Sequence, residues 1–114
     1  MYNFDKNKIM YNNDLDKFKD GKYINSSTGD FNDYPTSGFY AIYPSNSSLS
    51  NWSNIPSNTN RSPGMLFVFC AAKNSAGGSG YVLQLWTPWQ GGKMYTRTRW
   101  GSTWQNWHEL QYTS

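Results

Sequence analysis

The sequence has few of the residues that build disulfides, metal sites and catalytic centres. It contains one cysteine, Cys70, and one histidine, His108. A single cysteine excludes an internal disulfide, which indicates synthesis in a reducing cytosol or stability supplied by oligomerisation. Metal sites need several clustered His, Cys, Asp or Glu side chains, so we expect no metal and no other cofactor. Cys70 lies in the apolar run 65–72, which favours a small buried side chain over a nucleophile.

Catalytic groups are equally scarce, and we expect a protein that is not an enzyme. A Ser-His-Asp triad would have to use His108, which lies in a strand-like segment near the end of the chain. Glycoside hydrolysis needs two carboxylates that flank a bond. Asp33 and Glu109 are the pair that could meet, and nothing in the sequence brings them together. The glycine-rich segment 77–80 lacks the lysine and the following helix of a phosphate-binding loop.

Long apolar runs and one-sided charge are also missing. No segment approaches the ~20 apolar residues of a membrane-spanning helix, and the N-terminus lacks the apolar core of a signal peptide. The formal net charge is +3, and most lysines lie in the first quarter of the chain, interleaved with aspartates. Late in the chain, Arg97 and Arg99 are the only tight basic pair. We therefore expect a solvated surface, with no nucleic-acid partner and no membrane insertion.

Aromatic and small polar residues dominate what is present. Aromatic residues make up 18% of the 114 residues, whereas charged residues make up 15%. Aromatic and β-branched residues suit strands, and Asn, Ser and Gly suit turns. The composition predicts a mostly β fold, either an antiparallel β-sandwich or a knob-like sheet domain with long polar loops.

Five segments from Gly38 onward have the composition of strands. They are residues 38–43, 65–72, 81–86, 93–100 and 104–112. The segment 65–72 is a continuous apolar run, which is typical of a fully buried strand. Strict alternation in 93–100 places Tyr95, Arg97 and Arg99 on one face. The polar stretch 45–63 predicts a long loop, and loops of that length are usually functional or ordered by a partner.

The chain divides near Asp30. The stretch 1–29 is predicted to be an N-terminal arm, a linker or a partial repeat, and 30–114 a knob-like β domain. The partial-repeat alternative comes from an echo between residues 14–23 and 30–40, because both place an acidic residue and two hydrophobic residues before a Gly and a Tyr. One pair of segments is too little to establish a repeat array.

Several short motifs follow one another in a recognisable order. They are Gly38-Phe39-Tyr40, Pro63-Gly64-Met65-Leu66-Phe67-Val68, Val82-Leu83-Gln84, Tyr95-Thr96-Arg97 and Trp104-Gln105-Asn106-Trp107-His108-Glu109-Leu110. This order resembles the pyocin-knob type of domain, found near the C-terminal tips of phage and tailocin tail fibres. The resemblance covers roughly residues 30–110. It implies a β-rich knob on a trimeric fibre that contacts the host cell envelope, and it supplies no catalytic residues.

The resemblance also separates scaffold residues from candidate ligand contacts. Tyr95, Arg97, Trp104 and Trp107 belong to the shared pattern, so we expect them to be scaffold. Recognition surfaces vary with the host, which favours aromatic and basic residues outside the pattern. The predicted ligand-binding residues are Trp52, Trp86, Trp89, Arg99 and Trp100. Their rings would stack on sugars, and Arg99 would bind the polar groups.

These observations predict a non-enzymatic receptor-binding tip of a phage-type tail fibre. The expected ligand is a bacterial surface glycan, either a cell-wall polysaccharide or a teichoic acid. We expect a homotrimer in a virion tail fibre tip or a tailocin particle, acting at the bacterial cell surface. The alternative is a structural trimerisation or capping module of a fibre. A third possibility, a polysaccharide-degrading fragment, would depend on Asp33 and Glu109.

Overall fold

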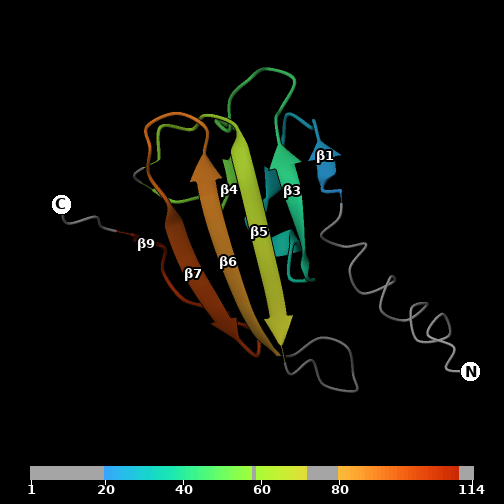
Figure 1. Ribbon diagram of the computed structural model, residues 1–114, viewed down its shortest axis with the longest axis vertical. Coiled ribbons are helices and arrows are strands. Elements are labelled where there is room, and N and C mark those ends of the chain that lie inside the picture. The colour runs from blue at the N-terminus through green and yellow to red at the C-terminus, as the bar shows by residue number, and fades with distance from the viewer. Residues whose placement is uncertain (1–19, 58, 72–79, 111–114) are drawn as a thin grey trace, which may run out of the picture.

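The computed structural model describes residues 20–57, 59–71 and 80–110, most of which lie in or beside one main sheet (Figure 1). The mostly β prediction is confirmed, because nine strands and one turn of 3-10 helix are the regular elements of this part of the chain. The strands form a seven-stranded sheet and a separate two-stranded sheet. Within the same residues, no helix has the length and apolar character needed to cross a membrane.

The main sheet is mixed but mostly antiparallel. Its strand order is β1-β3-β5-β6-β7-β8, and β9 also pairs with β7. β1 pairs with β3 in parallel, whereas β3, β5, β6 and β7 are antiparallel neighbours. The elements are β1 (Lys22–Ile24), β2 (Gly29–Asp30), η1 (Phe31–Asp33), β3 (Gly38–Ile42), β4 (Trp52–Ser53), β5 (Gly64–Ala71), β6 (Tyr81–Pro88), β7 (Tyr95–Trp100), β8 (Thr103–Trp104) and β9 (His108–Glu109).

The inward face of this sheet carries an aromatic core. The register places Leu66, Trp86 and Tyr95 side by side on β5, β6 and β7, and each is at most 3% exposed. Phe31 of η1 packs beneath this row. Its ring centroid lies 5.0 Å from that of Trp86 and 5.8 Å from that of Trp52. Four large rings, those of Phe31, Trp52, Trp86 and Tyr95, therefore share the core with five aliphatic side chains.

The polar stretch 45–63 forms the second layer of the domain. It contains β4, which pairs with β2 behind the long strands (Figure 1). Leu49 and Trp52 are 0% and 5% exposed, so they anchor the stretch in the core. The backbone N–H of Leu49 also donates to the carbonyl of Arg61 at 2.9 Å. A few apolar side chains are therefore enough to pack this long loop against the sheet.

The segment 65–72 is not fully buried, contrary to the prediction. Along β5, Leu66 and Val68 face the core, whereas Met65 and Phe69 are 43% and 46% exposed. The prediction is wrong because an apolar run does not show whether one or both faces of a strand are covered. Here the second layer lies on one face only.

The last predicted strand, 104–112, is wrong as a continuous strand. Within residues 103–110, Thr103–Trp104 and His108–Glu109 pair with β7. The N–H of Gln105 still donates to the carbonyl of Thr98 at 2.8 Å, and the chain then leaves the ladder until His108. Because the chain departs from the ladder here, Trp104 and Trp107 can both pack against the core. Residues 111 and 112 lie outside the described part.

The sheet begins before Asp30. β1 lies in the stretch 1–29 that the sequence assigned to an arm, a linker or a partial repeat. Its central residue Tyr23 pairs with Ala41 of β3. Residues 1–19, and with them most of the first echo segment, lie outside the described residues.

Gly64 provides a test of how tightly β5 and β6 approach each other. A Cβ atom at Gly64 would lie 2.4 Å from the carbonyl oxygen of Thr87 and 2.6 Å from the Cα of Pro88. Because both are backbone atoms, they can yield only if the strands move apart. We expect Gly64→Ala to lower the free energy of unfolding by about 1–3 kcal/mol, measured by urea denaturation.

The matched control for Gly64 is Gly92→Asn. A Cβ atom at Gly92 would have nothing within 4 Å, and asparagine tolerates the φ of +65 found there. We therefore expect this variant to unfold at nearly the same urea concentration as the wild-type chain. Equal stability of the two variants would contradict this account of the β5–β6 contact.

Candidate functional site

The candidate site is built around Arg97, a buried cation on the inward face of β7. The side chain is only 5% exposed. The register places it opposite Gln84 of β6, and its Nε donates to Gln84 Oε1 at 2.8 Å. The inward position follows from the alternation predicted for this strand, because Tyr95 two residues earlier also faces the core.

Gln84 fixes the position of that guanidinium. Its side-chain amide is fully buried, and Nε2 donates to the carbonyls of Phe31 at 2.8 Å and Tyr34 at 2.9 Å. With both donors directed at η1 and the residue after it, the amide oxygen must point toward Arg97. One glutamine therefore connects the sheet, η1 and Arg97.

Two indole rings enclose the Arg97 guanidinium. Its Cζ lies 3.9 Å from the ring centroid of Trp104 and 4.7 Å from that of Trp107. Both distances are within the range of cation–π attraction. Trp107 is held in place because its Nε1 donates to the carbonyl of Asn54 at 2.8 Å, and its ring packs 6.1 Å from Phe31. Both indoles are partly exposed, so each still presents surface to solvent.

Asn54 links the second layer to the same site. Its side-chain Nδ2 donates to Asp30 Oδ1 at 2.8 Å, and the same oxygen accepts the backbone N–H of Asn32 at 2.8 Å. Asn54 has φ 58, in the left-handed region that asparagine tolerates better than most residues. These contacts hold the chain turn at Asn54 beside Trp107.

Together these side chains line an open groove of about 490 Å³. The lining residues are Asn54, Ile55, Ser57, Arg97, Trp104, Gln105, Asn106 and Trp107. Gln105 and Asn106 are exposed at its rim. Indole surface suits the apolar C–H face of a sugar, and amide and hydroxyl groups suit its hydroxyls. Such a set can bind a carbohydrate without any chemical step.

The charge of the groove is positive at its base. Burial lowers the pKa of the Arg97 guanidinium from its ordinary value to about 10, although the Asp30 carboxylate acts to raise it. The side chain therefore stays protonated at neutral pH. Its Nη2 is buried and has no hydrogen-bond acceptor among the described residues.

Two of the predicted ligand-binding residues belong to the core. Trp86 is 0% and Trp52 5% exposed. The Nε1 of Trp52 donates to the carbonyl of Ser26 at 3.2 Å, and its ring fills the space in which a Cβ at Gly29 would lie. Neither ring has a free face for a sugar in this conformation, so neither can form part of a binding surface.

The remaining predicted residues do not share one site. Trp89 and Trp100 are 68% and 67% exposed, but they lie at opposite ends of the β6–β7 hairpin. Trp100 pairs with Tyr81 at the start of β6, whereas Trp89 follows its last residue. Eight steps of about 3.3 Å separate Tyr81 from Trp89 along the chain, roughly 25 Å. Arg99 faces inward, and its Cζ lies 5.4 Å from the Trp104 ring centroid.

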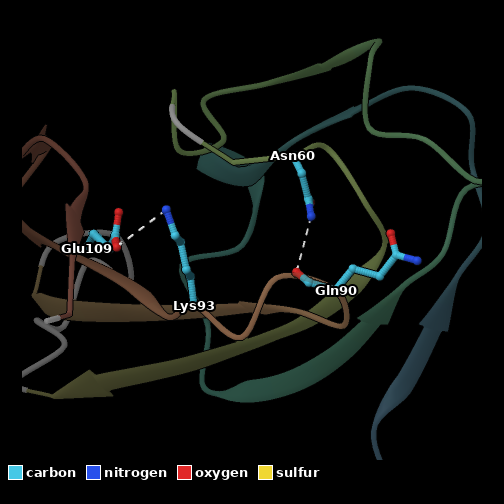
Figure 2. A network of polar contacts seen from close by, with 4 residues as sticks. All are labelled: Asn60, Gln90, Lys93 and Glu109. Atoms are coloured by element: carbon cyan, nitrogen blue, oxygen red, sulfur yellow. Dashed lines mark hydrogen bonds and ion pairs between the residues drawn. The ribbon is translucent and has the colours of Figure 1, made fainter. Parts of the chain in front are cut away.

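A second polar cluster lies at the Trp89 end of the hairpin (Figure 2). Asn60 Nδ2 donates to the carbonyl of Gln90 at 3.2 Å, and Lys93 Nζ lies 3.7 Å from Glu109 Oε2. These contacts border a small cavity of about 100 Å³. Glu109, one of the two carboxylates considered for hydrolysis, is thus in an ion pair. Elsewhere in the described residues, no three His, Cys, Asp or Glu side chains gather into a possible metal site.

Sequence reasoning named Arg97, Trp104 and Trp107 but expected them to be scaffold. The structure shows that Trp104 and Trp107 pack against the core, that Arg97 is buried, and that all three also line the groove. The opposite wall, at Asn54, lies 53 residues away from Trp107 in the chain. No local pattern in the sequence signals that meeting.

The comparisons with known proteins concern the fold. No family model and no curated protein matches the chain. The selenomethionine structure of an N-truncated R2-type pyocin tail fibre is similar, with a TM-score of 0.65 and 20% identity over 82% of this chain. The structure of C-terminal residues of the R2 pyocin fibre of P. aeruginosa gives a TM-score of 0.63, again with 20% identity over 82% of this chain.

This chain corresponds to 34% of the first fibre chain and 23% of the second. It therefore spans about a third or less of either. The resemblance stated from the sequence motifs is confirmed at the level of fold: the chain has the fold of a part of R2-type pyocin tail fibres.

Proposed function

We propose that this chain is a non-enzymatic receptor-binding domain of a phage-type tail fibre, in a virion or a tailocin, that recognises carbohydrate on the bacterial surface. The observation that carries this proposal is the groove between Trp104, Trp107 and Asn54, which combines indole surface with amide and hydroxyl groups. The fold shared with R2-type pyocin tail fibres supports the assignment to a fibre.

Binding would use side chains that are already in position. The indole N–H of Trp107 is bonded to the second layer, and Trp104 packs on Arg97. Rings held in this way lose little conformational entropy when a sugar stacks on them. The exposed amides of Gln105 and Asn106 would meet the hydroxyls. A cell-wall polysaccharide or a teichoic acid presents the repeated units that such a groove fits.

We also propose that the chain forms a homotrimer, so that several grooves act on one polymer. Individual weak sites on one particle raise the total affinity by orders of magnitude. The outward face of the main sheet supports association between copies, because its strand positions carry mostly apolar side chains. They include Ala41, Met65, Phe67, Tyr81, Leu83, Leu85 and Trp100. In Figure 1 none of the described elements lies in front of the long strands.

The second candidate function is a structural trimerisation or capping module of a fibre. The same outward face favours it, since exposed apolar patches commonly mark protein interfaces. Unlike the first candidate, this function does not require the groove to bind a ligand.

Cell-wall binding tests the receptor function. We expect the labelled chain to bind purified bacterial cell walls and to lose binding after teichoic acids and polysaccharides are stripped from them. The double variant Gln105→Ala/Asn106→Ala should bind about tenfold more weakly, a loss of about 1.4 kcal/mol, because its exposed amides no longer meet the ligand. A pull-down titration on walls measures both effects.

The matched control is Asn46→Ala, which removes an exposed amide in a different loop. Loss of binding with Trp89→Ala or Trp100→Ala, while the groove variant binds normally, would move the site to the exposed tryptophans. Absence of binding across a broad panel of walls, with the oligomer intact, would favour the structural cap.

Sedimentation equilibrium tests the trimer. We expect the wild-type chain to sediment as a trimer and Met65→Glu to shift it toward the monomer, because a carboxylate in an apolar interface is costly to desolvate. Gln90→Glu adds the same charge on an exposed turn and should leave the mass unchanged. A wild-type chain that stays monomeric at high concentration would contradict the proposal.

A further inference from the structure

The groove holds a positive charge that the protein itself compensates only in part. Arg97 is 5% exposed, and its one hydrogen bond to a described residue uses Nε. Its Nη2 has no acceptor among those residues, and none of their carboxylates forms an ion pair with it. A buried polar group is normally paired with protein, water, an ion or a ligand, and this unpaired N–H group belongs to a residue that lines the groove.

The Asp30 carboxylate, which acts electrostatically on Arg97, forms its hydrogen bonds with other residues. Burial lowers the pKa of Arg97, and Asp30 offsets part of that lowering through its electrostatic field rather than by direct contact. Asp30 Oδ1 accepts from the N–H of Asn32 and from Nδ2 of Asn54, both at 2.8 Å. These bonds hold Asp30 on η1, so it cannot turn to Arg97 without releasing the chain at Asn54.

The shape of the site restricts what can approach the guanidinium. The ring centroids of Trp104 and Trp107 lie 3.9 and 4.7 Å from Cζ of Arg97, and Nε already donates to Gln84. The remaining N–H groups lie at the edge of the planar fork. That edge matches the oxygen spacing of a carboxylate or phosphate better than a single hydroxyl. Since Nη2 is closed to solvent in this conformation, a side chain at the rim must move as the ligand enters.

We propose that the groove selects an acidic saccharide, whose carboxylate or phosphate group binds the free edge of Arg97 while a sugar ring packs on Trp104 or Trp107. This inference rests on the proposed carbohydrate-binding function and adds the charge of the ligand to it. Arg97 then has two roles: it donates a hydrogen bond from β7 to Gln84, and it binds the negative group of the ligand.

Walls with chemically altered acidic groups test this inference. One sample is treated with hydrofluoric acid, which removes phosphate-linked polymers, and a second has its uronic-acid carboxylates reduced to alcohols. We expect one of the two treatments to weaken binding of the wild-type chain at least tenfold, since hydrogen bonds to charged groups are among the strongest in proteins. Loss of binding after carboxylate reduction identifies the carboxylate as the bound acid, and loss after hydrofluoric acid identifies the phosphate-linked polymer as the ligand.

The outcomes separate the two proposals. Unchanged binding to walls that have received both treatments would overturn the acidic-ligand inference and leave carbohydrate recognition intact. No binding to untreated walls would overturn the proposed function itself.

Two variants with the same loss of charge separate specific recognition from general attraction. Arg97→Gln should bind treated and untreated walls equally, whereas Lys93→Gln should keep the wild-type preference because Lys93 lies on the exposed turn with Glu109. Equal losses in both variants would show that net charge alone attracts the chain, and would overturn the inference.

Arg97→Gln also loses packing between the two indoles, so its folding is checked by circular dichroism. If it does not fold, the indole N–H resonances of the wild-type chain are followed by NMR while soluble acidic wall polymer is added. Shifts concentrated on Trp104 and Trp107 support the inference. Shifts confined to Trp89 and Trp100 would overturn it.

Discussion

The side chain of Gln84 is the interaction on which the rest of the domain depends. It is fully buried in the middle of the sheet, donates to the carbonyls of Phe31 and Tyr34, and accepts from Arg97. Leaving a buried polar group unpaired costs about 1–3 kcal/mol, and three groups rely on this one amide. By holding η1 beneath the sheet, Gln84 places Phe31 among three tryptophans. By orienting Arg97, it positions the groove.

The two faces of one sheet have different roles because only one of them is covered. Inward residues meet η1 and the stretch 45–63, which together form the aromatic core and one wall of the groove. Outward residues of β5 and β6, such as Met65 and Tyr81, remain 43% and 44% exposed. The same period-2 alternation thus produces a rigid binding scaffold on one side and an apolar surface for association on the other.

The four long strands and their alternation were predictable because they depend on local chemistry, whereas the short strands β1 and β4 were not predicted. The alternation of Tyr95, Arg97 and Arg99 was read correctly, and so were the positions of the four long strands. The prediction that 65–72 is buried on both faces was wrong, because the layer that covers one face comes from residues distant in the sequence. The break between Trp104 and His108 inside the predicted strand 104–112 also escaped prediction, since it depends on where Trp107 finds space. The burial of Trp86 was not predictable either, because nothing in the local sequence distinguishes a core indole from an exposed one.

By itself, the sequence determined a mostly β chain that is rich in aromatic side chains and has an order of motifs that matches a fibre domain in fold. Those properties follow from residue type and spacing along the chain. Only the tertiary structure decided which indoles are buried and which line a groove. That decision rests on contacts such as the 2.8 Å bond from Trp107 to Asn54, between residues 53 positions apart. Such contacts form because each buried polar group needs a partner, and the folded chain determines which partner is within reach.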